Sequence, residues 1–474
     1  MRTKQLGLIL GPLLFLLSFL ISEPIVSPLG DKVIAVALWM ITWWVTEAVS
    51  ISVTALLPLL LFPILKVMPI DEVGGYYGSP IIFLFFGGFV LALALEKVNL
   101  HRRIALSIIK YTGATPNRVI LGFMIATGFL SMWISNTATT VVMLPIAMSV
   151  IYLLIKDEDG FTKKDKNFAL SVMLGIAFSA NAGGVATVIG TPPNSVLIGL
   201  LENEFNIEIS FLKWMVLGLP FSALMIGIIY WVLIKFFPST GLNFNASKNV
   251  IDEELEKLGP TSAKEKHVLI IFGITIALWI SRTLLNSIMP GLKLNDTMIS
   301  MAGAIAMFAI PHSFKKGDFI LEWKDTQKLA WGILILFGGG LALAKGMSAS
   351  GIVDSVSELI ANANLPVLIT VAILITLMLF MTELMSNVAL VAVLAPVVAG
   401  IAIGLEIPIL YLLIPVTIAS SCAFMLPMAT PPNAIVFASG YIKVKDMVRV
   451  GIILNCIAII LLIIAYKFAI PFLF

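Results

Sequence analysis

The sequence predicts an all-α integral membrane protein of about 11 transmembrane helices, built from an inverted repeat with two re-entrant hairpins. Three observations carry this prediction. The 474 residues are 59% hydrophobic and only 12% charged, with a mean hydropathy of +1.04, so the chain is more apolar than ordinary globular proteins. Apolar runs long enough to cross a bilayer recur along it. Polar, helix-breaking motifs occur twice within this apolar sequence, about half a chain apart.

The apolar runs predict helices, because they lack the strict alternation of barrel strands. The first run follows Arg2 and Lys4, and Glu23-Pro24 follows it where a signal peptide would have a small-residue cleavage site. We therefore expect a retained first helix within residues 1–29. Further examples of apolar runs are 33–49, 216–237, 267–280 and 452–465.

The basic residues indicate the orientation. With the N-terminus in the cytoplasm, most Lys and Arg fall in cytoplasmic segments, and acids such as Glu202, Glu204 and Glu208 fall in outer loops, as the positive-inside rule expects. An odd number of spans then places the C-terminus outside. The cytoplasmic set includes Arg102, Arg103, Arg118, Lys163, Lys164, Lys248, Lys257, Lys264, Lys315, Lys316, Lys324, Lys443, Lys445 and Arg449.

Motifs at matching offsets show that the chain is duplicated. Ser135-Asn136-Thr137 is followed by Ser386-Asn387-Val388 at an offset of 251 residues, and Phe86-Gly87-Gly88 is followed by Phe337-Gly338-Gly339 at the same offset. A constant offset between several motifs indicates one duplicated unit.

A second motif pair recurs at a shorter offset. Thr191-Pro192-Pro193-Asn194 is matched by Thr430-Pro431-Pro432-Asn433 at an offset of 239, because only the first unit contains the polar stretch 156–166. The polar segment 238–266 separates the units and predicts a cytoplasmic linker. The first repeat is then 30–237 and the second 267–474. Each has an odd number of crossings, so the two are inverted relative to each other in the membrane.

Both units present their parts in the same order. A Gly-rich helix (81–97; 331–346), in which close packing explains the glycines, precedes an amphipathic interfacial stretch (100–111; 352–361). Two short apolar half-spans follow, joined at the Ser-Asn dipeptide, which predicts a re-entrant hairpin with its tip near the midplane. These half-spans are 119–134 with 139–154, and 367–384 with 389–402.

At a hairpin tip, backbone groups leave helical pairing and need partners that lipid cannot supply. Ser and Asn at one such tip are most simply helix caps, whereas two copies favour a binding site. In each Thr-Pro-Pro-Asn motif the prolines forbid the helix, which frees backbone carbonyls near Gly190 and Ala429. Such oxygens suit a hard cation such as Na⁺, and the hydroxyls of Thr191 and Thr430 suit a carboxylate.

The charge distribution gives an independent indication. No Lys or Arg lies near either tip or either Pro-Pro break in the sequence, although an uncompensated dianion at membrane depth is very costly. Bound cations are the simplest neutralising groups. Glu383 is the one ionisable residue close to a tip; either it lines a cation pocket or nearby backbone amides satisfy it.

Over nearly its whole length the chain resembles the divalent anion/sodium symporter family. The resemblance rests on Met132-Trp133-Ile134-Ser135-Asn136-Thr137-Ala138-Thr139-Thr140 and on Phe424-Met425-Leu426-Pro427-Met428-Ala429-Thr430-Pro431-Pro432-Asn433-Ala434. It implies a homodimer with a scaffold domain, about 30–113 and 267–363. It also implies a transport domain, about 114–237 and 364–474, that moves as an elevator with Na⁺ and a dicarboxylate.

The resemblance also implies site residues. The first sodium site would use Ser131, Ser135, Asn136 and Gly190; the second would use Thr382, Met385, Asn387 and Ala429, with Met385 and Ala429 giving carbonyls. The substrate would meet Ser135, Asn136, Thr137, Thr191, Pro192, Ser386, Asn387, Val388, Thr430 and Pro431. Val388 departs from the threonine of a full motif, which removes one hydroxyl.

The expected function is sodium-coupled import of C4 dicarboxylates such as succinate, malate or fumarate across the plasma membrane. A sodium-independent dicarboxylate exchanger of the same family is the first alternative, and an anion channel is the second. An enzyme is not expected, because no nucleophile, base and orienting acid cluster at a tip. Hydroxyl and amide walls accept succinate, citrate and sulfate alike, so these residues leave the preferred anion open.

Overall fold

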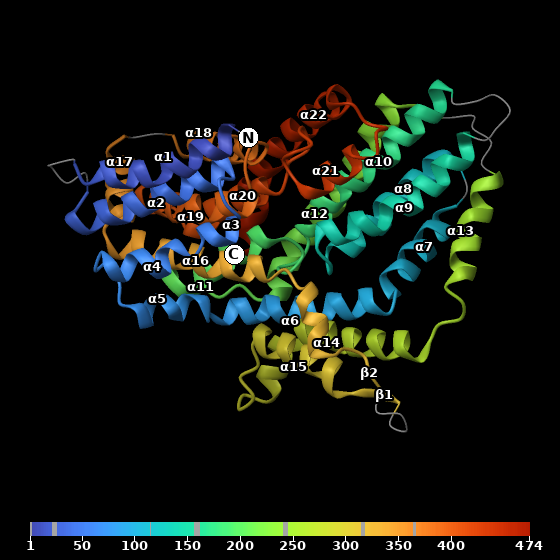
Figure 1. Cartoon of the computed structure of the whole chain (residues 1–474), viewed down its shortest axis with the longest axis horizontal. Helices are drawn as coiled ribbons and strands as arrows, with labels where there is room; N and C mark the ends of the chain where they lie inside the picture. Colours follow the sequence, from blue (N-terminus) through green and yellow to red (C-terminus); the bar gives the residue numbers. More distant parts are fainter. Residues whose placement is uncertain are drawn as a thin grey trace.

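A computed structural model of the chain describes residues 2–20, 26–113, 115–155, 162–239, 245–313, 318–363 and 366–474. The described chain is mostly helical, as the sequence predicts, with one small antiparallel pair of strands, β1 (Pro311–Ser313) and β2 (Asp318–Phe319) (Figure 1). Lys315, Lys316, the polar stretch 156–161 and the predicted domain boundaries at 114 and 364 lie outside the described residues.

The N-terminal helices form one packed group. Helix α1 lies along α2, where Phe15 contacts Trp39 with ring centroids 5.2 Å apart. Gly11 provides the close approach, since a Cβ there would come within 2.8 Å of the Trp39 and Trp43 rings. The helices are α1 (Arg2–Ser18), α2 (Pro28–Thr46), α3 (Ile51–Thr54), α4 (Leu57–Ile64) and α5 (Ile70–Tyr77).

Two sets of seven helices follow the same order in the two repeats. The first is α6 (Pro80–Lys97), α7 (Leu100–Thr112), α8 (Pro116–Ser131), α9 (Asn136–Ile155), α10 (Lys163–Gly184), α11 (Pro192–Phe205) and α12 (Phe211–Phe236). The second is α16 (Trp331–Ala349), α17 (Ile352–Ala363), α18 (Val367–Thr382), α19 (Asn387–Gly404), α20 (Ile409–Ser420), α21 (Pro431–Phe437) and α22 (Val444–Ile464). The chain closes with a π-helical turn, Ala465–Ala469, and α23 (Ile470–Leu473).

The segment between these sets contains more structure than a simple linker. It has α13 (Asn245–Lys257), α14 (Ala263–Ile288), α15 (Asp296–Ala309), the two strands and a 3₁₀ turn η1 (Trp323–Lys328). Helix α13 occupies the predicted linker and packs against α7, where Arg102 pairs with Glu254 and Lys110 Nζ lies 2.7 Å from Asp252 Oδ1. The linker therefore includes a docked helix, a feature that its polar composition did not reveal.

By length and composition, seven described helical segments can cross a membrane. They are Pro28–Thr46, Ile70–Lys97, Phe211–Phe236, Ala263–Ile288, Trp331–Ala349, Asn387–Gly404 and Val444–Leu473. The hairpin helix α18 and the segment 136–152 of α9 are among the shorter apolar helices, in line with half-spans. Helix α19, in contrast, which contains the predicted half-span 389–402, is one of the seven segments long enough to cross. The expected total of about 11 crossings stays a prediction.

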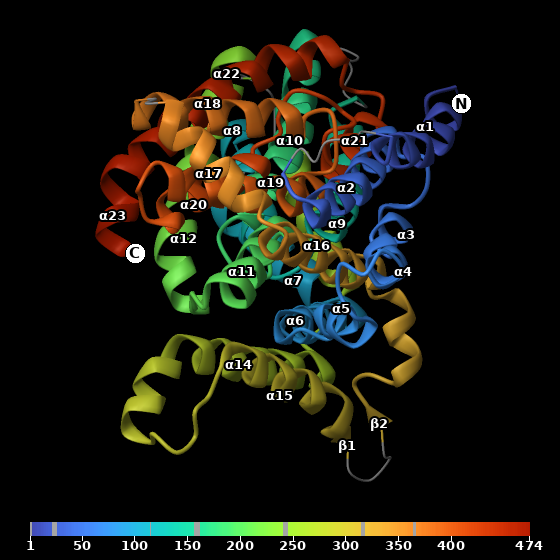
Figure 2. The ribbon, with the colours of Figure 1, turned by 90° about the vertical axis from the view of Figure 1, so that its left-hand side faces the viewer.

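Helices α14 and α15 and the strands lie along one edge of the molecule, next to α6, in two perpendicular views (Figures 1 and 2). Gly87 permits the α6 to α15 approach, because a Cβ there would lie 2.2 Å from Ser300 Oγ. In the second repeat, Gly338 and Gly339 pack equally closely on Tyr77 and Ala55. The Gly-rich helices thus use their glycines for helix packing, as expected.

Candidate functional site

The four polar motifs lie where helices break. Helices α8 and α9 are separated by the residues 132–135, and α18 and α19 by 383–386. At both tips the serine acts as an N-cap: Ser135 Oγ accepts a hydrogen bond from the Ala138 amide at 3.2 Å, and Ser386 Oγ accepts one from the Ala389 amide at 3.5 Å. Each serine therefore has a structural role at its tip.

The Pro-Pro motifs also start helices after an unwound segment. Helix α10 ends at Gly184 and α11 begins at Pro192, while α20 ends at Ser420 and α21 begins at Pro431. Proline is favoured at the first helical position because it has no amide hydrogen to leave unpaired there. The residues 185–191 and 421–430 are the unwound segments that the two prolines predict.

The breaks of the two units come together crosswise. Helix α9, which begins at the first tip, packs against α21, and α19, which begins at the second tip, packs against α11. Helix α10 also packs against α21. Each hairpin therefore lies against the broken helix of the other unit, so that a site between them includes residues from both halves of the chain.

Three of the four residues predicted for the first sodium site meet in the structure. Ser131 Oγ lies within hydrogen-bond distance of Asn136 Oδ1 and of the Ala180 carbonyl, 2.8 Å away. A Cβ on Gly184 would lie 2.5 Å from Asn136 Oδ1 and 3.1 Å from the Gly190 carbonyl oxygen. The Asn136 amide oxygen and the Gly190 carbonyl thus approach the same glycine. The fourth residue, Ser135, lies on the same tip.

The second predicted sodium site is only partly assembled. Thr382 Oγ1 donates a 2.7 Å hydrogen bond to the Ser420 carbonyl at the end of α20, and Ser131 Oγ similarly bonds the Ala180 carbonyl on α10, although Ala180 and Ser420 are one position from equivalence at the offset of 239. Met385 and Asn387 lie on the second tip, and Ala429 lies in the unwound segment. Within the described ranges, no hydrogen bond joins the Asn387 side chain to another residue.

The predicted substrate residues differ in exposure. Thr137 on the first tip is exposed, whereas its counterpart Val388 is only 8% exposed. Thr191 and Thr430 are both buried. The prolines that follow them differ, since Pro192 is half-buried and Pro431 is exposed. Exposure therefore differs from position to position: Thr137 is more exposed than Val388, whereas on the second tip itself Leu384 is 69% exposed.

Two asparagines at the ends of the Thr-Pro-Pro-Asn motifs hold the unwound segments. Asn194 Nδ2 donates to the Thr187 carbonyl at 2.8 Å, and Asn433 Nδ2 donates to the Leu426 carbonyl at 3.0 Å. The two acceptors are separated by the same 239 residues as the two donors. Asn194 and Asn433 are not among the site residues predicted from the sequence, although their duplication in the motif is a signal for them.

The environment of Glu383 decides between the two interpretations of this acid. Its carboxylate accepts hydrogen bonds from the backbone amides of Phe424, Met425 and Leu426 at 2.9 to 3.0 Å. The Asn455 side chain on α22 donates a fourth bond at 2.8 Å. Amides therefore satisfy Glu383, and its carboxyl group holds the unwound segment of the second unit through these hydrogen bonds.

A cavity of about 310 Å³ borders the first tip. One wall consists of Ala138, Val141 and Val142 at the start of α9, and the opposite wall includes Lys97 on α6 and Lys328 on η1. The exposed Thr137 immediately precedes this wall. The cavity thus opens toward the first tip from the side where α6 ends.

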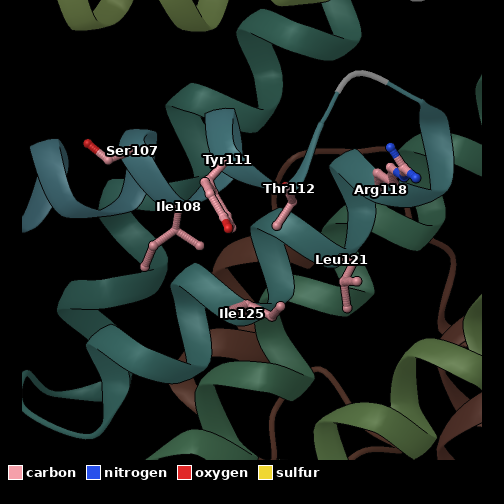
Figure 3. Close-up of a pocket in the computed structure, with 7 residues that line it drawn as sticks. All are labelled: Ser107, Ile108, Tyr111, Thr112, Arg118, Leu121 and Ile125. Atoms are coloured by element: carbon pink, nitrogen blue, oxygen red, sulfur yellow. The ribbon is translucent and has the colours of Figure 1, made fainter.

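A larger hollow of about 760 Å³ is lined by α7 and α8 (Figure 3). Its lining comes from these two helices alone and includes none of the predicted site residues. The lining residues are Ser107, Ile108, Tyr111, Thr112, Arg118, Leu121 and Ile125. This hollow is separate from the helix breaks.

Comparison with known proteins shows to which family the chain belongs. A family model described as the sodium:sulfate symporter transmembrane region matches residues 3–473. The chain belongs to the sodium:sulfate symporter family. This agrees with the resemblance to divalent anion/sodium symporters in the sequence, and family membership together with the apolar helices makes the chain a multi-pass membrane protein.

Individual members of the family are similar over almost the whole chain. A protein from Staphylococcus saprophyticus named sodium-dependent dicarboxylate transporter SdcS is 41% identical over 478 residues, which are 99% of this chain and 92% of that protein. The protein of the same name from Staphylococcus aureus strain USA300 is 40% identical over 477 residues, 99% of this chain and 91% of the relative.

A solved structure shares the fold at low sequence identity. The Alcanivorax borkumensis YdaH transporter superposes with a TM-score of 0.58 at 11% identity, covering 84% of this chain and 88% of that one. At this identity the similarity shows a shared fold alone.

Proposed function

We propose that this sodium:sulfate symporter family member is a sodium-coupled symporter that imports C4 dicarboxylates such as succinate, malate and fumarate. The observation that carries the proposal is the chemistry of the four breaks. They present hydroxyl, amide and carbonyl groups, and no Lys or Arg side chain is hydrogen-bonded or ion-paired to the described residues there. A dianion in such a place needs co-bound cations. The names of the two relatives support the same function.

The proposed sites follow the sequence-based assignment. One Na⁺ binds at Ser131, Ser135, Asn136 and Gly190, and a second binds at Thr382, Met385, Asn387 and Ala429. The approach of Asn136 Oδ1 and the Gly190 carbonyl to Gly184 supports the first site, and oxygen ligands of this kind suit a hard cation. The dicarboxylate is held by Ser135, Asn136, Thr137, Thr191, Pro192, Ser386, Asn387, Val388, Thr430 and Pro431.

Transport proceeds by an elevator movement in a homodimer, with the scaffold and transport parts as the sequence predicts. The N-terminus is cytoplasmic and the C-terminus is outside. The exposed Thr137, the buried Val388 and the cavity next to Ala138 support an arrangement open toward the cytoplasm, because the basic end of α6 faces that side under the positive-inside rule.

The test is uptake of radiolabelled succinate into proteoliposomes with and without an inward Na⁺ gradient. The proposal expects uptake that requires sodium. Equal uptake in choline and sodium buffers, together with stimulation by internal succinate, would identify an exchanger instead. Currents above ordinary carrier turnover in a bilayer recording would identify a channel. Competition of unlabelled malate, citrate or sulfate with radiolabelled succinate then ranks the affinities of the transporter for these anions.

A further inference from the structure

One buried side chain of the first repeat reaches the broken helix of the second. Asn181 lies on α10 and is 1% exposed. Its Nδ2 is 3.1 Å from the Ala423 carbonyl, 3.1 Å from Thr430 Oγ1 and 3.3 Å from Asn433 Oδ1. Its three partners therefore all belong to the unwound segment and motif of the second unit.

The neighbours of Asn181 determine which of its side-chain atoms faces them. The Ala423 carbonyl can only accept a hydrogen bond. Asn433 Nδ2 donates to the Ala423 and Leu426 carbonyls at 3.1 and 3.0 Å, so that its oxygen is the atom facing Asn181. Asn181 must therefore present its NH₂ group to this cluster.

This NH₂ group determines how the Thr430 hydroxyl is used. A hydroxyl has one hydrogen and two acceptor lone pairs. Thr430 Oγ1 accepts from Asn181 Nδ2 at 3.1 Å and from the Asn433 amide at 3.4 Å, which occupies both lone pairs. The described part of the chain offers no acceptor for the hydroxyl hydrogen. Thr430 is thus held as a donor that lacks a protein acceptor.

Among the described residues, the equivalent positions show no such arrangement. The position equivalent to Asn181, at the offset of 239, is Ser420, whose hydroxyl donates to the Thr417 carbonyl of its own helix. Thr191, the counterpart of Thr430, makes no side-chain cap bond to the start of its helix. Of the two motif threonines, Thr191 and Thr430, only Thr430 is therefore oriented by a side chain of the other repeat.

We propose that Asn181 is a positioning residue for anion recognition, which fixes the Thr430 hydroxyl as a hydrogen-bond donor to one carboxylate of the substrate. The inference rests on the proposed function and deepens it by naming a residue that favours acceptor-only anionic groups. A carboxylate accepts and does not donate, so it complements a hydroxyl whose lone pairs are both occupied. Asn181 itself touches the protein and acts through Thr430.

The test is equilibrium binding of radiolabelled succinate to the purified full chain at saturating sodium, which needs no transport. Asn181→Asp replaces the NH₂ group by an acceptor, so that the Thr430 hydroxyl turns toward residue 181. We expect its Kd for succinate to rise about tenfold or more, and that of Asn181→Ala to rise less. The sodium concentration for half-saturation should stay within about twofold of the wild-type value.

A double-mutant cycle separates positioning from a general structural effect. In a Thr430→Val background, Asn181→Ala should change the succinate Kd by less than about twofold, because the hydroxyl that it orients is absent. Asn167→Asp, on the same helix but bonded to the Pro238 carbonyl, is the matched control and should bind like wild type. If Asn181→Asp does not fold, the succinate Kd values of Asn181→Ala and Asn181→Ser are compared with that of wild type instead.

The outcomes distinguish this inference from the proposed function. Wild-type protein that binds no succinate in sodium would contradict the proposed function. Wild-type protein that binds succinate, with Asn181 variants of unchanged Kd, would overturn the inference alone. An Asn181→Ala effect of equal size with and without the Thr430 hydroxyl would also overturn it.

Discussion

The two tip asparagines occupy equivalent sequence positions but different surroundings. Asn136 Oδ1 lies near the Ser131 hydroxyl and close to Gly184, whereas the Asn387 amide has no hydrogen-bond partner among the described residues. Both are half-buried. Neither side chain is part of the apolar core, so each can be removed without opening a large cavity there.

Replacing either tip asparagine by alanine should remove transport and leave the protein folded. We expect sodium-dependent succinate uptake by Asn136→Ala and by Asn387→Ala to fall by about tenfold or more, since a lost hydrogen bond to a charged group is worth about 1.5 to 3 kcal/mol. Size-exclusion profiles should match wild type. Wild-type uptake rates in either variant would refute the proposed site.

Glu383 shows how a buried acid can serve structure near a site. Its three amide donors come from consecutive residues that have left helical pairing after α20 ends at Ser420. The equivalent position in the first unit is Met132, whose carbonyl accepts from Thr187 Oγ1 at 2.6 Å. A hydroxyl thus ties the first tip to its unwound segment, and a carboxylate ties the second.

Glu383→Ala should lower thermal stability. The substitution leaves the buried amide of Phe424 and the partly buried amides of Met425 and Leu426 without their acceptor, at a cost of about 1–3 kcal/mol in the free energy of unfolding. Thermal unfolding of the detergent-solubilised protein measures the loss. Glu358→Ala, at an exposed position on α17, is the control. An unchanged melting temperature for Glu383→Ala would contradict a holding role.

At the scale of elements, each broken helix combines a local stop with a specific anchor. The Pro-Pro pair prevents the helix from continuing backward, and the motif asparagine then binds carbonyls of the unwound segment, as Asn194 and Asn433 do. Glycines allow the backbone to come close. Gly184, at the end of α10, leaves room for Asn136 Oδ1 and the Gly190 carbonyl.

Gly184→Ala should therefore damage the first proposed cation site. The added methyl group would lie 2.5 Å from Asn136 Oδ1, and relieving such overpacking costs about 1–3 kcal/mol. We expect the sodium concentration for half-maximal uptake to rise by about tenfold. Gly227→Ala on α12, where a Cβ meets no atom within 4 Å, should behave as wild type. Equal sodium dependence in both variants would argue against this site.

At the scale of the whole molecule, the two units interlock. The crosswise packing of α9 on α21 and of α11 on α19 means that neither unit completes the helix breaks alone. Helix α13 links the units and is docked on α7 by Arg102 and Glu254, while Arg103 Nε lies 2.6 Å from Glu265 Oε1 at the start of α14. The helices around the first tip are thereby tied to the connecting segment.

Cysteine labelling tests the arrangement of the tips. In a background of Cys422→Ala and Cys456→Ser, we expect Thr137→Cys to react with a membrane-impermeant thiol reagent from the cytoplasmic side and Val388→Cys to be protected. The reason is that Thr137 is exposed and Val388 is 8% exposed. During turnover, labelling from the outer side should show the opposite pattern, with Val388→Cys reactive and Thr137→Cys protected. Labelling that stays unchanged during turnover would favour local gating of the hairpins.

The sequence by itself determined the helical membrane architecture, the duplication and the positions of all four breaks. These features depend on local chemistry: apolar runs predict helices, and a Pro-Pro pair stops a helix wherever it occurs. The helix limits at Ser131, Asn136, Pro192 and Pro431 accordingly lie within or next to the predicted motifs.

Only the tertiary structure decided which groups meet at the breaks. Asn181 contacts Thr430 across 249 residues, and Glu383 contacts Asn455 across 72. The docking of α13 on α7 likewise joins Arg102 to Glu254 across 152 residues. Such contacts depend on how the helices pack and not on local pattern, because a buried polar side chain must be satisfied by whatever partner the fold brings near. The repeat predicts equivalent positions, and the packing makes their environments unequal.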